Sequence, residues 1–489
     1  MLNSIKESPL YPIVNPKSIA FFGASNNFSS MGTSQFNSLR DLGFEGTIYP
    51  VHPKEEKVQN LKAYRSVLDL PEVPDLAVLV VPTKIVSKLL EECGEKGIKH
   101  AIIVSGGFKE VGAEGGDREQ ELTAIATKYG IRFLGPNCIG VANPYHKLNT
   151  TFLRYLGDPG FIGMASQSGS FVTQMFNYLS RFSLGFSTAF SVGNEANFDI
   201  VDCLEYLGAC PNTKVIALYI EGIRRGREFM EMARSIIPYK PIVALYIGGS
   251  ETGRQAGFSH TGALAGPDQL YDGMFHQSGV IRAYSIGELF DMCWVLGRLP
   301  KPRGSRVVIQ THSGGPGAAA ADSCGREGLE LPALSQDTVK KLAPLVPNTG
   351  SIHNPVDITF TKNPMDYFSD IPKILLEEDN TDILLVYFLV PSQMVNRALE
   401  RMGLSKDQVI EKSAKFIDAQ CKSIARLIET YNKPIVGFTF RSIQEDFTKS
   451  LINQGVPVFE GPERAVRALK ASVKYSRLSE KVLISTSKG

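Results

Sequence analysis

The chain has 489 residues, of which 43% are hydrophobic and 21% charged, with 52 lysines and arginines against 50 aspartates and glutamates. A formal charge of +2 gives no broad positive field, so the composition argues against a nucleic-acid-binding or membrane-surface protein. The longest uninterrupted apolar stretch, Ile383 to Val390, is far shorter than the ~20 residues of a membrane helix. We therefore expect a globular protein of several domains that binds neither nucleic acid nor membrane.

Seven cysteines are spread singly along the chain, and no two of them form a C-x-x-C pair. The odd number argues against a disulfide framework, and the spacing argues against a cysteine-based zinc site, so no metal site is expected. The first residues, MLNSIKESPLYPIV, lack the apolar segment and the cleavage site of a signal peptide. Together these features predict a cytoplasmic protein with reduced thiols.

Short runs rich in Val, Ile, Phe and Tyr recur along the chain, and a helix-like stretch follows most of them. This alternation is typical of βαβ units and predicts an α/β fold with mostly parallel sheets. The predicted strands are 18–23, 47–52, 76–82, 100–105 and 132–136, then 161–165, 186–192, 215–221, 242–247 and 280–284, and finally 306–311, 382–390, 434–440 and 456–460.

The stretch 299–305 concentrates proline, glycine and charge, which predicts a linker. With the three sets of strands, it indicates doubly wound domains at 1–150, 151–300 and 301–475, followed by a tail at 476–489. In open parallel sheets, ligands bind at the carboxyl ends of the strands, so the loops that follow each strand are the candidate sites.

The first such loop, FFGASNNFSSMG, places Gly23 and Gly32 on either side of a polar turn. Ser25 and Asn26 occupy the central positions, so the loop lacks the G-x-G-x-x-G fingerprint and disfavours a nicotinamide-dependent dehydrogenase. The turn could present backbone N–H groups to a phosphate, and a plain strand-to-helix turn explains it equally well. The later strands of this set end near Lys54, Val81–Pro82, Ser105–Gly106 and the GPNC segment 135–138, where small residues suit a flat or extended ligand such as a nucleotide.

In the second set, the segment SQSGSF places Ser168 and Gly169 at the start of a predicted helix, whose unpaired N–H groups would favour an anion. An ordinary serine cap is the alternative, and the absence of G-x-S-x-G disfavours a serine hydrolase. Glu221 ends the strand 215–221, where its carboxylate could project into a site, although exposed glutamates at strand ends are common.

The long glycine-rich segment 248–266 carries His260 near its middle. Long loops of this kind are usually functional, and a neutral imidazole is a capable nucleophile. His312 is a competing candidate, because it precedes a second glycine-led helix that begins near Gly314 and Gly315.

Nine motifs in this order resemble those of the α subunit of the NDP-forming (ADP-forming) acyl-CoA synthetases, which are relatives of succinyl-CoA synthetase. The resemblance runs from Ser18 to about Ala471, and SHTGALAG with the upstream YIEG is its most specific part. The motifs are GAS (23–25), YPVHPK (49–54), GPNCIG (135–140), SQSGSF (166–171), SVGNEANFD (191–199), YIEG (219–222), SHTGALAG (259–266), SGGPGAAAAD (313–322) and NPVDI (354–358).

The resemblance implies a CoA-binding Rossmann domain followed by two flavodoxin-like domains. It also implies that His260 becomes phosphorylated and passes phosphate between an acyl phosphate and a nucleoside diphosphate, while Glu221 orients it. Ser168, Gly169, Gly314 and Gly315 would stabilise that phosphate. The implied CoA-binding residues are Gly23, Ala24, Ser25, Gly32, Lys54, Val81, Pro82, Ser105, Gly106 and Asn137.

The chain departs from the family pattern in two places, since a lysine usual near Ser30 is absent and His52 replaces an asparagine. No segment is typical of an ATP-grasp module, so either a separate β subunit holds Mg²⁺ and ATP or ADP, as in the two-subunit members of the family, or this chain has lost that half. The expected assembly is an α₂β₂ hetero-oligomer, or a homodimer of this chain alone. Two alternatives stay open: a non-catalytic CoA-binding or assembly subunit, and a CoA-dependent acyl transfer that uses no nucleotide.

Overall fold

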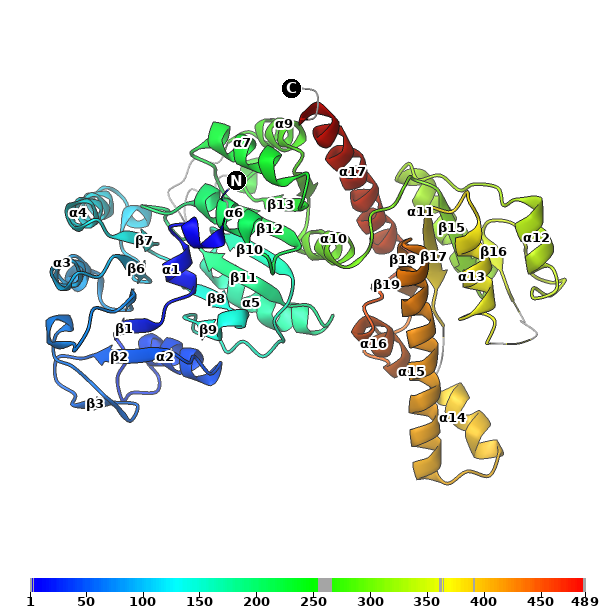
Figure 1. Cartoon of the computed structure of the whole chain (residues 1–489), viewed down its shortest axis with the longest axis horizontal. Coiled ribbons are helices and arrows are strands. Elements are labelled where there is room, and N and C mark those ends of the chain that lie inside the picture. Colours follow the sequence, from blue (N-terminus) through cyan, green and yellow to red (C-terminus); the bar gives the residue numbers. More distant parts are fainter. Residues whose placement is uncertain are drawn as a thin grey trace. The chain divides into compact units, whose positions relative to one another are not determined.

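The protein is described by a computed structural model that covers residues 2, 4–253, 266–359, 363, 365–389 and 392–486 (Figure 1). The chain forms two compact units, of which the first comprises Met1–Ser180 with Leu184–Leu289. The second comprises Arg181–Ser183 with Phe290–Gly489. The first unit contains two large sheets and the second contains one.

The first sheet has five parallel strands in the order β2-β1-β5-β6-β7. Helices α3 and α4 lie side by side against it (Figure 1). The elements of this part are α1 (Tyr11–Val14), β1 (Ser18–Phe22), α2 (Met31–Asp41), β2 (Thr47–Val51), β5 (Leu76–Leu79), α3 (Val86–Lys96), β6 (His100–Ile103), α4 (Ala113–Tyr129) and β7 (Arg132–Leu134), with a small antiparallel pair of β3 (Lys57–Val58) and β4 (Leu61–Lys62).

The second sheet has the order β14-β13-β12-β10-β11-β8-β9. Five of its strands are parallel, whereas β8 pairs antiparallel with β11 and with β9. Its elements are β8 (Val141–Asn143), β9 (Leu148–Asn149), β10 (Ile162–Ser166), α5 (Gly169–Ser180), β11 (Phe186–Ser191), α6 (Ile200–Ala209), β12 (Val215–Ile220), α7 (Gly226–Ile236), β13 (Ile242–Tyr246), α9 (Asp268–Ser278) and β14 (Ile281–Ala283). Strands β8 and β9 therefore join this sheet although they precede residue 150.

The chain passes into the second unit within α10 (Ile286–Arg298) and then through the predicted linker 299–305, which contains no helix or strand. The third sheet is parallel, in the order β16-β15-β17-β18-β19. Its elements are β15 (Val307–Thr311), α11 (Gly314–Arg326), α12 (Gln336–Leu342), β16 (Val356–Asp357), α13 (Asp370–Glu377), β17 (Ile383–Tyr387), α14 (Ser392–Arg401), α15 (Lys406–Tyr431), β18 (Ile435–Thr439), α16 (Asp446–Asn453), β19 (Val458–Glu460) and α17 (Pro462–Thr486).

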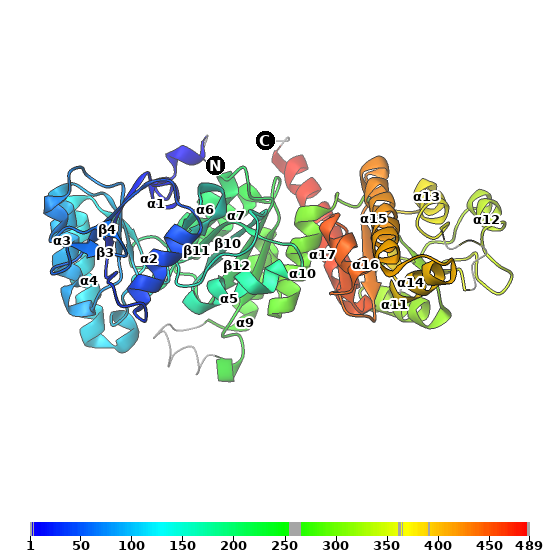
Figure 2. The same cartoon turned by 90° about the horizontal axis from the view of Figure 1, so that it is seen from below.

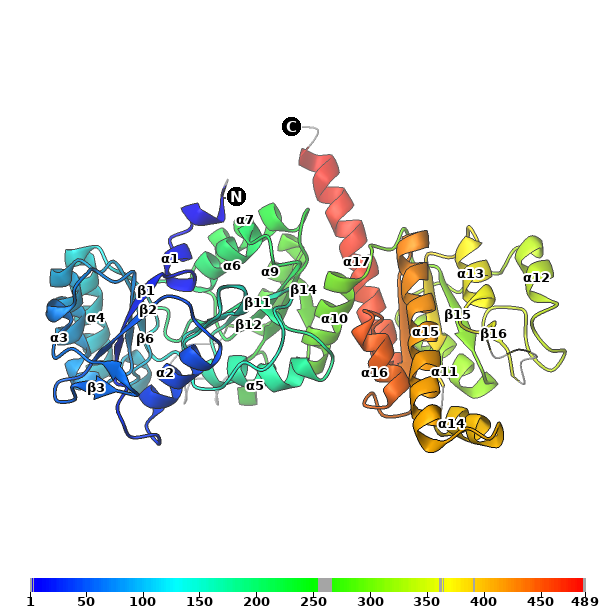
Figure 3. The same cartoon turned by 60° about the horizontal axis from the view of Figure 1, so that its bottom comes forward.

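The helices of the second unit cover this sheet and also pack on one another. Helix α15 lies beside α16 (Figure 2), and α14 lies against α15 (Figure 3). Helix α17 packs on α11 and continues to Thr486, through most of the stretch expected to be a tail.

Every predicted strand is present, and the predicted α/β fold class with parallel sheets is confirmed. The central strands are readable because both of their faces are covered: all residues of β1, β10 and β15 are buried, which requires continuous apolar runs. Among the described helices, none is long and apolar enough to cross a membrane.

The turn after β1 depends on two glycines. Gly23 has a φ of +94°, and a Cβ atom there would lie 1.9 Å from the carbonyl oxygen of Val80. A Cβ atom at Gly32, in the first turn of α2, would lie 2.2 Å from the carbonyl oxygen of Gly23. The backbone of this helix therefore approaches the end of β1 as closely as it does only because both side chains are hydrogen atoms.

We expect Gly23→Ala to lower the free energy of unfolding of the first unit by about 3 kcal/mol, because backbone strain and steric overlap add. Gly130→Ala is the matched control, since Gly130 also has a positive φ, +65°, but nothing lies within 4 Å of its Cβ position. The control should cost about 1 kcal/mol. Urea unfolding measures the free energy of unfolding of both variants. Equal losses in the two variants would exclude the close approach of the Val80 carbonyl as the reason why position 23 requires glycine.

Candidate active site

The loop after β1 is held in one conformation by its own polar groups. The Ser25 N–H donates to Thr33 Oγ1 at 3.0 Å, and Gln59 Nε2 donates to the carbonyl of Ser25 at 2.9 Å. Asn26 Oδ1 accepts the Gln59 N–H at 3.0 Å, while Ser30 caps α2 by accepting the Thr33 N–H. The loop is thus preformed, with the N-terminus of α2 directly behind it.

His52 stabilises the turn that follows β2. Its Nδ1 atom accepts the N–H groups of Glu55, at 2.9 Å, and of Lys54, at 3.3 Å. An asparagine side-chain oxygen stabilises a turn through the same kind of bond. His52 therefore holds this turn, and the side chain of Lys54 on it is exposed.

The ends of β5, β6 and β7 are joined into one rim. Ser105 Oγ donates to the carbonyl of Val81 at 2.5 Å and accepts the Val81 N–H at 3.3 Å. The Asn137 N–H donates to the carbonyl of Ser105 at 2.9 Å, and Thr83 Oγ1 donates to the carbonyl of Gly106 at 2.5 Å. The predicted CoA-binding residues of three strand ends therefore lie side by side, and their contact with CoA stays a prediction.

At the carboxyl end of the second sheet, the side chain of Gln167 links three segments. Its Oε1 atom accepts the N–H groups of Glu221, at 2.5 Å, and of Gly222, at 3.0 Å. Its Nε2 atom donates to the carbonyl of Gly222 at 2.6 Å and to Glu195 Oε2 at 2.8 Å. Sequence reasoning singled out Glu221 and Ser168 but missed Gln167, whose only signal was its place in SQSGSF.

The helices α5 and α11 begin with the same local turn. Ser166, the last residue of β10, donates its hydroxyl to the carbonyl of Ser168 at 2.7 Å, and α5 begins at Gly169. Thr311, the last residue of β15, donates to the carbonyl of Ser313 at 2.8 Å, and α11 begins at Gly314. Both glycine-led helix starts expected from the sequence are therefore present, each in its own unit.

His260 lies outside the described residues, but both ends of the segment that carries it are described. Tyr246, the last residue of β13, stacks on Tyr271 with ring centroids 3.6 Å apart and donates its hydroxyl to the carbonyl of Gly266 at 2.8 Å. The Tyr271 hydroxyl accepts the N–H of Ile223 at 3.1 Å. The segment therefore leaves and re-enters the fold beside the loop that carries Glu221.

His312, the competing candidate, is partly buried. Its ring stacks on Tyr367 with centroids 3.6 Å apart and an angle of 17° between the planes. Its Nε2 atom is buried and has no hydrogen-bond partner within the described part of the chain. Burial lowers the pKa of His312 to about 4, against a smaller opposing effect of Asp357. The ring is neutral, but one face and Nε2 are closed to a reacting phosphate.

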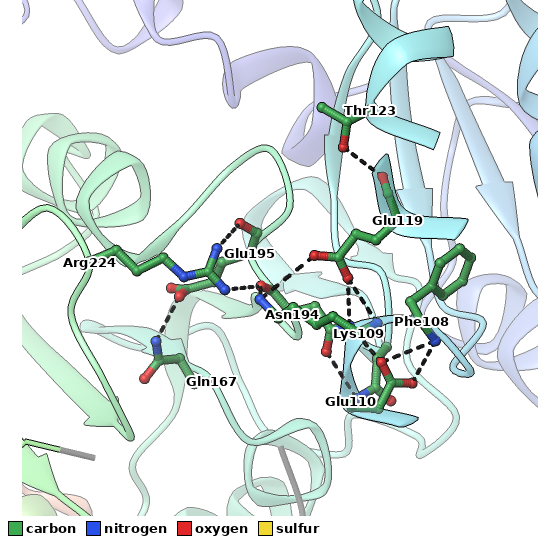
Figure 4. A network of polar contacts seen from close by, with 10 residues as sticks. Phe108, Lys109, Glu110, Glu119, Thr123, Gln167, Asn194, Glu195 and Arg224 are labelled. Atoms are coloured by element: carbon green, nitrogen blue, oxygen red, sulfur yellow. Dashed lines mark hydrogen bonds and ion pairs between the residues drawn. The ribbon is translucent and has the colours of Figure 1, made fainter. Parts of the chain in front are cut away.

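Asn194 connects the first sheet to the second within the first unit (Figure 4). Its Nδ2 donates to Glu110 Oε2 at 2.6 Å and to Glu119 Oε2 at 2.9 Å. Its carbonyl accepts from Lys109 Nζ and, at 3.0 Å, from Arg224 Nη2. The motif SVGNEANFD pointed to this segment, but these partners could not be read from it.

Two carboxylates of this network have strongly altered acidity. Burial raises the pKa of Glu195 to about 8, although the hydrogen bond from Gln167 opposes the shift. Burial likewise raises the pKa of Glu119 to about 7, against the hydrogen bond from Asn194. For Glu195, both carboxyl oxygens accept N–H donors, from Gln167 at 2.8 Å and from Ile200 at 2.9 Å.

Three family models match the chain in succession: a CoA binding domain over residues 17–144, a succinyl-CoA ligase like flavodoxin domain over 159–296, and a ligase-CoA domain over 307–480. The chain is 38% identical to the α subunit of the ADP-forming acetate–CoA ligase II of Pyrococcus furiosus, over 95% of this chain and 97% of that one. The chain belongs to the ADP-forming acyl-CoA ligases.

Two further relatives place the chain within this ligase family. An ADP-forming acetate–CoA ligase I of Archaeoglobus fulgidus is 37% identical over 95% of this chain, which spans 64% of that longer protein. The structure of the dinucleotide-forming acetyl-coenzyme A synthetase 1 of Candidatus Korarchaeum cryptofilum, solved with phosphate and ADP, is 31% identical. It matches with a TM-score of 0.86 over 97% of this chain and 98% of that one. The resemblance drawn from the motifs is confirmed.

Because the pKa of Glu119 is raised in the folded chain, we expect the free energy of unfolding to fall as the pH rises. The folded chain binds a proton at Glu119 up to about pH 7, whereas the unfolded chain releases it near the ordinary value of 4.5. Between these values the folded state binds more protons, so this contribution to stability is lost with rising pH. The variant Glu119→Gln has no titrating group at this position and therefore lacks this pH-dependent contribution.

The free energy of unfolding of Glu119→Gln, relative to wild type, should therefore rise by about 2 kcal/mol between pH 5 and 7.5. Urea unfolding at several pH values measures this difference. The exposed neighbour Glu121 provides the control Glu121→Gln, which should show no such trend. A relative stability of Glu119→Gln that falls with rising pH would contradict the raised pKa.

Proposed function

We propose that this chain is the α subunit of an ADP-forming acyl-CoA synthetase, which interconverts acyl-CoA, phosphate and ADP with a carboxylic acid, CoA and ATP. The observation that carries the proposal is the similarity over 97% of an α subunit of an ADP-forming acetate–CoA ligase. The placement of Glu221 beside the glycine-led start of α5 supports it, because Gln167 bonds directly to the backbone of Glu221.

In the first step a phosphate oxygen attacks the carbonyl carbon of the thioester. The carbon–sulfur bond breaks, the acyl phosphate forms, and the CoA thiolate takes up a proton. The rim formed by Val81, Ser105 and Asn137, together with the loop at Gly23 to Ser25, would bind CoA with its thioester at the carboxyl edge of the first sheet. Lys54 would contact a CoA phosphate.

In the second step a ring nitrogen of His260 attacks the phosphorus of the acyl phosphate, and the carboxylate leaves. Phosphohistidine then gives its phosphoryl group to the terminal phosphate of ADP, which restores the imidazole and completes ATP. Glu221 would orient the ring, and the helix start at Ser168 and Gly169 would stabilise the phosphate charge. A phosphate-stabilising role for Gly314 and Gly315, at the start of α11, rests on the resemblance alone.

A separate ATP-grasp β subunit would hold the nucleotide and Mg²⁺. Within the described ranges, no three His, Cys, Asp or Glu side chains are grouped so that they could hold a metal ion. The length relation supports this division, because the chain spans nearly all of an α subunit but 64% of a longer relative. The assembly would be an α₂β₂ hetero-oligomer. All seven cysteines lie in the described residues and are free and buried, which suits the cytoplasm.

We expect phosphate from ATP to label His260. In the complex of this chain with its ATP-grasp subunit, γ-labelled ATP and Mg²⁺ should give an acid-labile, base-stable label that mass spectrometry assigns to His260. His260→Ala should abolish the label, and His312→Ala should retain it because His312 is covered by Tyr367. Label on His312 would move the nucleophile. Absence of any label with CoA still bound would favour a non-catalytic CoA-binding subunit.

We expect Lys54→Ala to weaken CoA binding about tenfold, because a charge-assisted contact to phosphate is lost. Isothermal titration calorimetry measures the affinity, and the difference should shrink at high salt. Lys88→Ala is the control, since Lys88 is an exposed lysine of α3. Unchanged affinity of Lys54→Ala would remove Lys54 from the CoA site.

A further inference from the structure

We propose that Gln167 is a positioning residue of the phosphoryl-transfer site, and that Glu195 holds its amide group in the one orientation that fixes Glu221. This inference rests on the proposed function, since it assigns Glu221 to the orientation of His260. It adds two residues that the motifs did not single out, and it concerns how the site is held together rather than which groups react.

The hydrogen-bonding capacity of the Gln167 side chain is fully used. An amide has two N–H donors and two acceptor lone pairs on its oxygen. The donors reach the carbonyl of Gly222, at 2.6 Å, and Glu195 Oε2, at 2.8 Å. The oxygen accepts from the N–H groups of Glu221, at 2.5 Å, and Gly222, at 3.0 Å. A flipped amide would oppose donor to donor and acceptor to acceptor at these places, so only one orientation is stable.

The backbone of Gln167 is anchored to the same neighbouring strand as its side chain. Its N–H donates to the carbonyl of Tyr219 at 3.2 Å, two residues before Glu221. The next residues along the chain, Ser168 and Gly169, form the start of α5. The Glu221 loop and the helix start therefore cannot shift against each other without breaking bonds to Gln167, and a displacement of about 1 Å is enough to impair a transfer reaction.

Glu195 is suited to orient the amide because both of its carboxyl oxygens accept N–H donors in the structure. Its second oxygen accepts the N–H of Ile200 at 2.9 Å, and its backbone carbonyl accepts from Arg224 Nη1 at 3.1 Å (Figure 4). The residue is 8% exposed and has a φ of +57°. A buried carboxyl group in a left-handed backbone conformation is costly, so its use at this place indicates a positioning role.

Two exchanges and their combination test the inference. Gln167→Glu keeps the acceptors for Glu221 and Gly222 but sets carboxylate oxygens against the carbonyl of Gly222 and against Glu195. Glu195→Gln places an amide N–H against either Gln167 Nε2 or the Ile200 N–H. In the double variant, the new amide at 195 can donate to the new carboxylate at 167, which restores one bond in the reverse direction.

The measurement is the rate of label transfer from γ-labelled ATP to the chain, in its complex with the ATP-grasp subunit. Gln167→Glu should slow the maximal rate about 100-fold and Glu195→Gln about tenfold, while the KM for ATP changes less than about threefold. The double variant should react at least about tenfold faster than Gln167→Glu. A maximal rate of Gln167→Glu within about twofold of wild type, or a double variant as slow as the product of the single effects, would overturn the inference.

Gln120 and Glu121 are exposed residues of α4 and offer matched controls. The variants Gln120→Glu and Glu121→Gln make the same exchanges and should leave the rate unchanged. CoA affinity and the melting temperature monitor folding. If Gln167→Glu loses CoA binding, the test uses the maximal rate of Glu195→Gln relative to wild type instead. An unchanged maximal rate of Glu195→Gln would refute the role of Glu195. Failure of the wild type to take up label would refute the proposed function itself, which separates the two outcomes.

Discussion

The first unit depends on a polar connection between two sheets, and Asn194 is its centre. The side chain is 5% exposed, and it bonds at once to Glu110, Glu119 and Asn137, while its carbonyl accepts from two cationic side chains. Buried polar groups are tolerated only when each has a partner, and here the partners come from both sheets. The loops at the carboxyl edges of the first and second sheets are therefore held as one body.

This connection matters because the proposed reaction uses groups from both sheets. In the proposed mechanism, an acyl phosphate formed at the first sheet would have to reach a histidine carried by the second, so the two edges need a fixed relation. Gln167 extends the same principle inside the second sheet, where it joins the start of α5 to the Glu221 loop. In the same proposal, a phosphohistidine would allow the nucleotide to bind at a separate place, because each phosphoryl transfer requires alignment of two partners only.

Helix starts that begin with glycine recur at α5 and α11, and both follow a strand whose last hydroxyl bonds to a carbonyl two residues later. The sequence indicated these helix starts because glycine follows serine directly after an apolar run. The shortest strands were not predicted from the sequence. The strands β9 and β16 have only two residues each, which is too short for a periodicity. Their pairing was decided by the neighbours that the folded sheets offer.

The sequence by itself determined the long parallel strands, the order of the domains and the family, because buried strands require apolar runs and close turns require glycine at set places. Only the tertiary structure decided that His52 holds the Lys54 turn, that Tyr367 covers His312, and that Gln167 orients Glu221. Gln167 and Glu221 are 54 positions apart, and Gln167 and Glu195 are 28 apart. Such contacts arise when the sheet brings distant strand ends together, and no local pattern of residues encodes them.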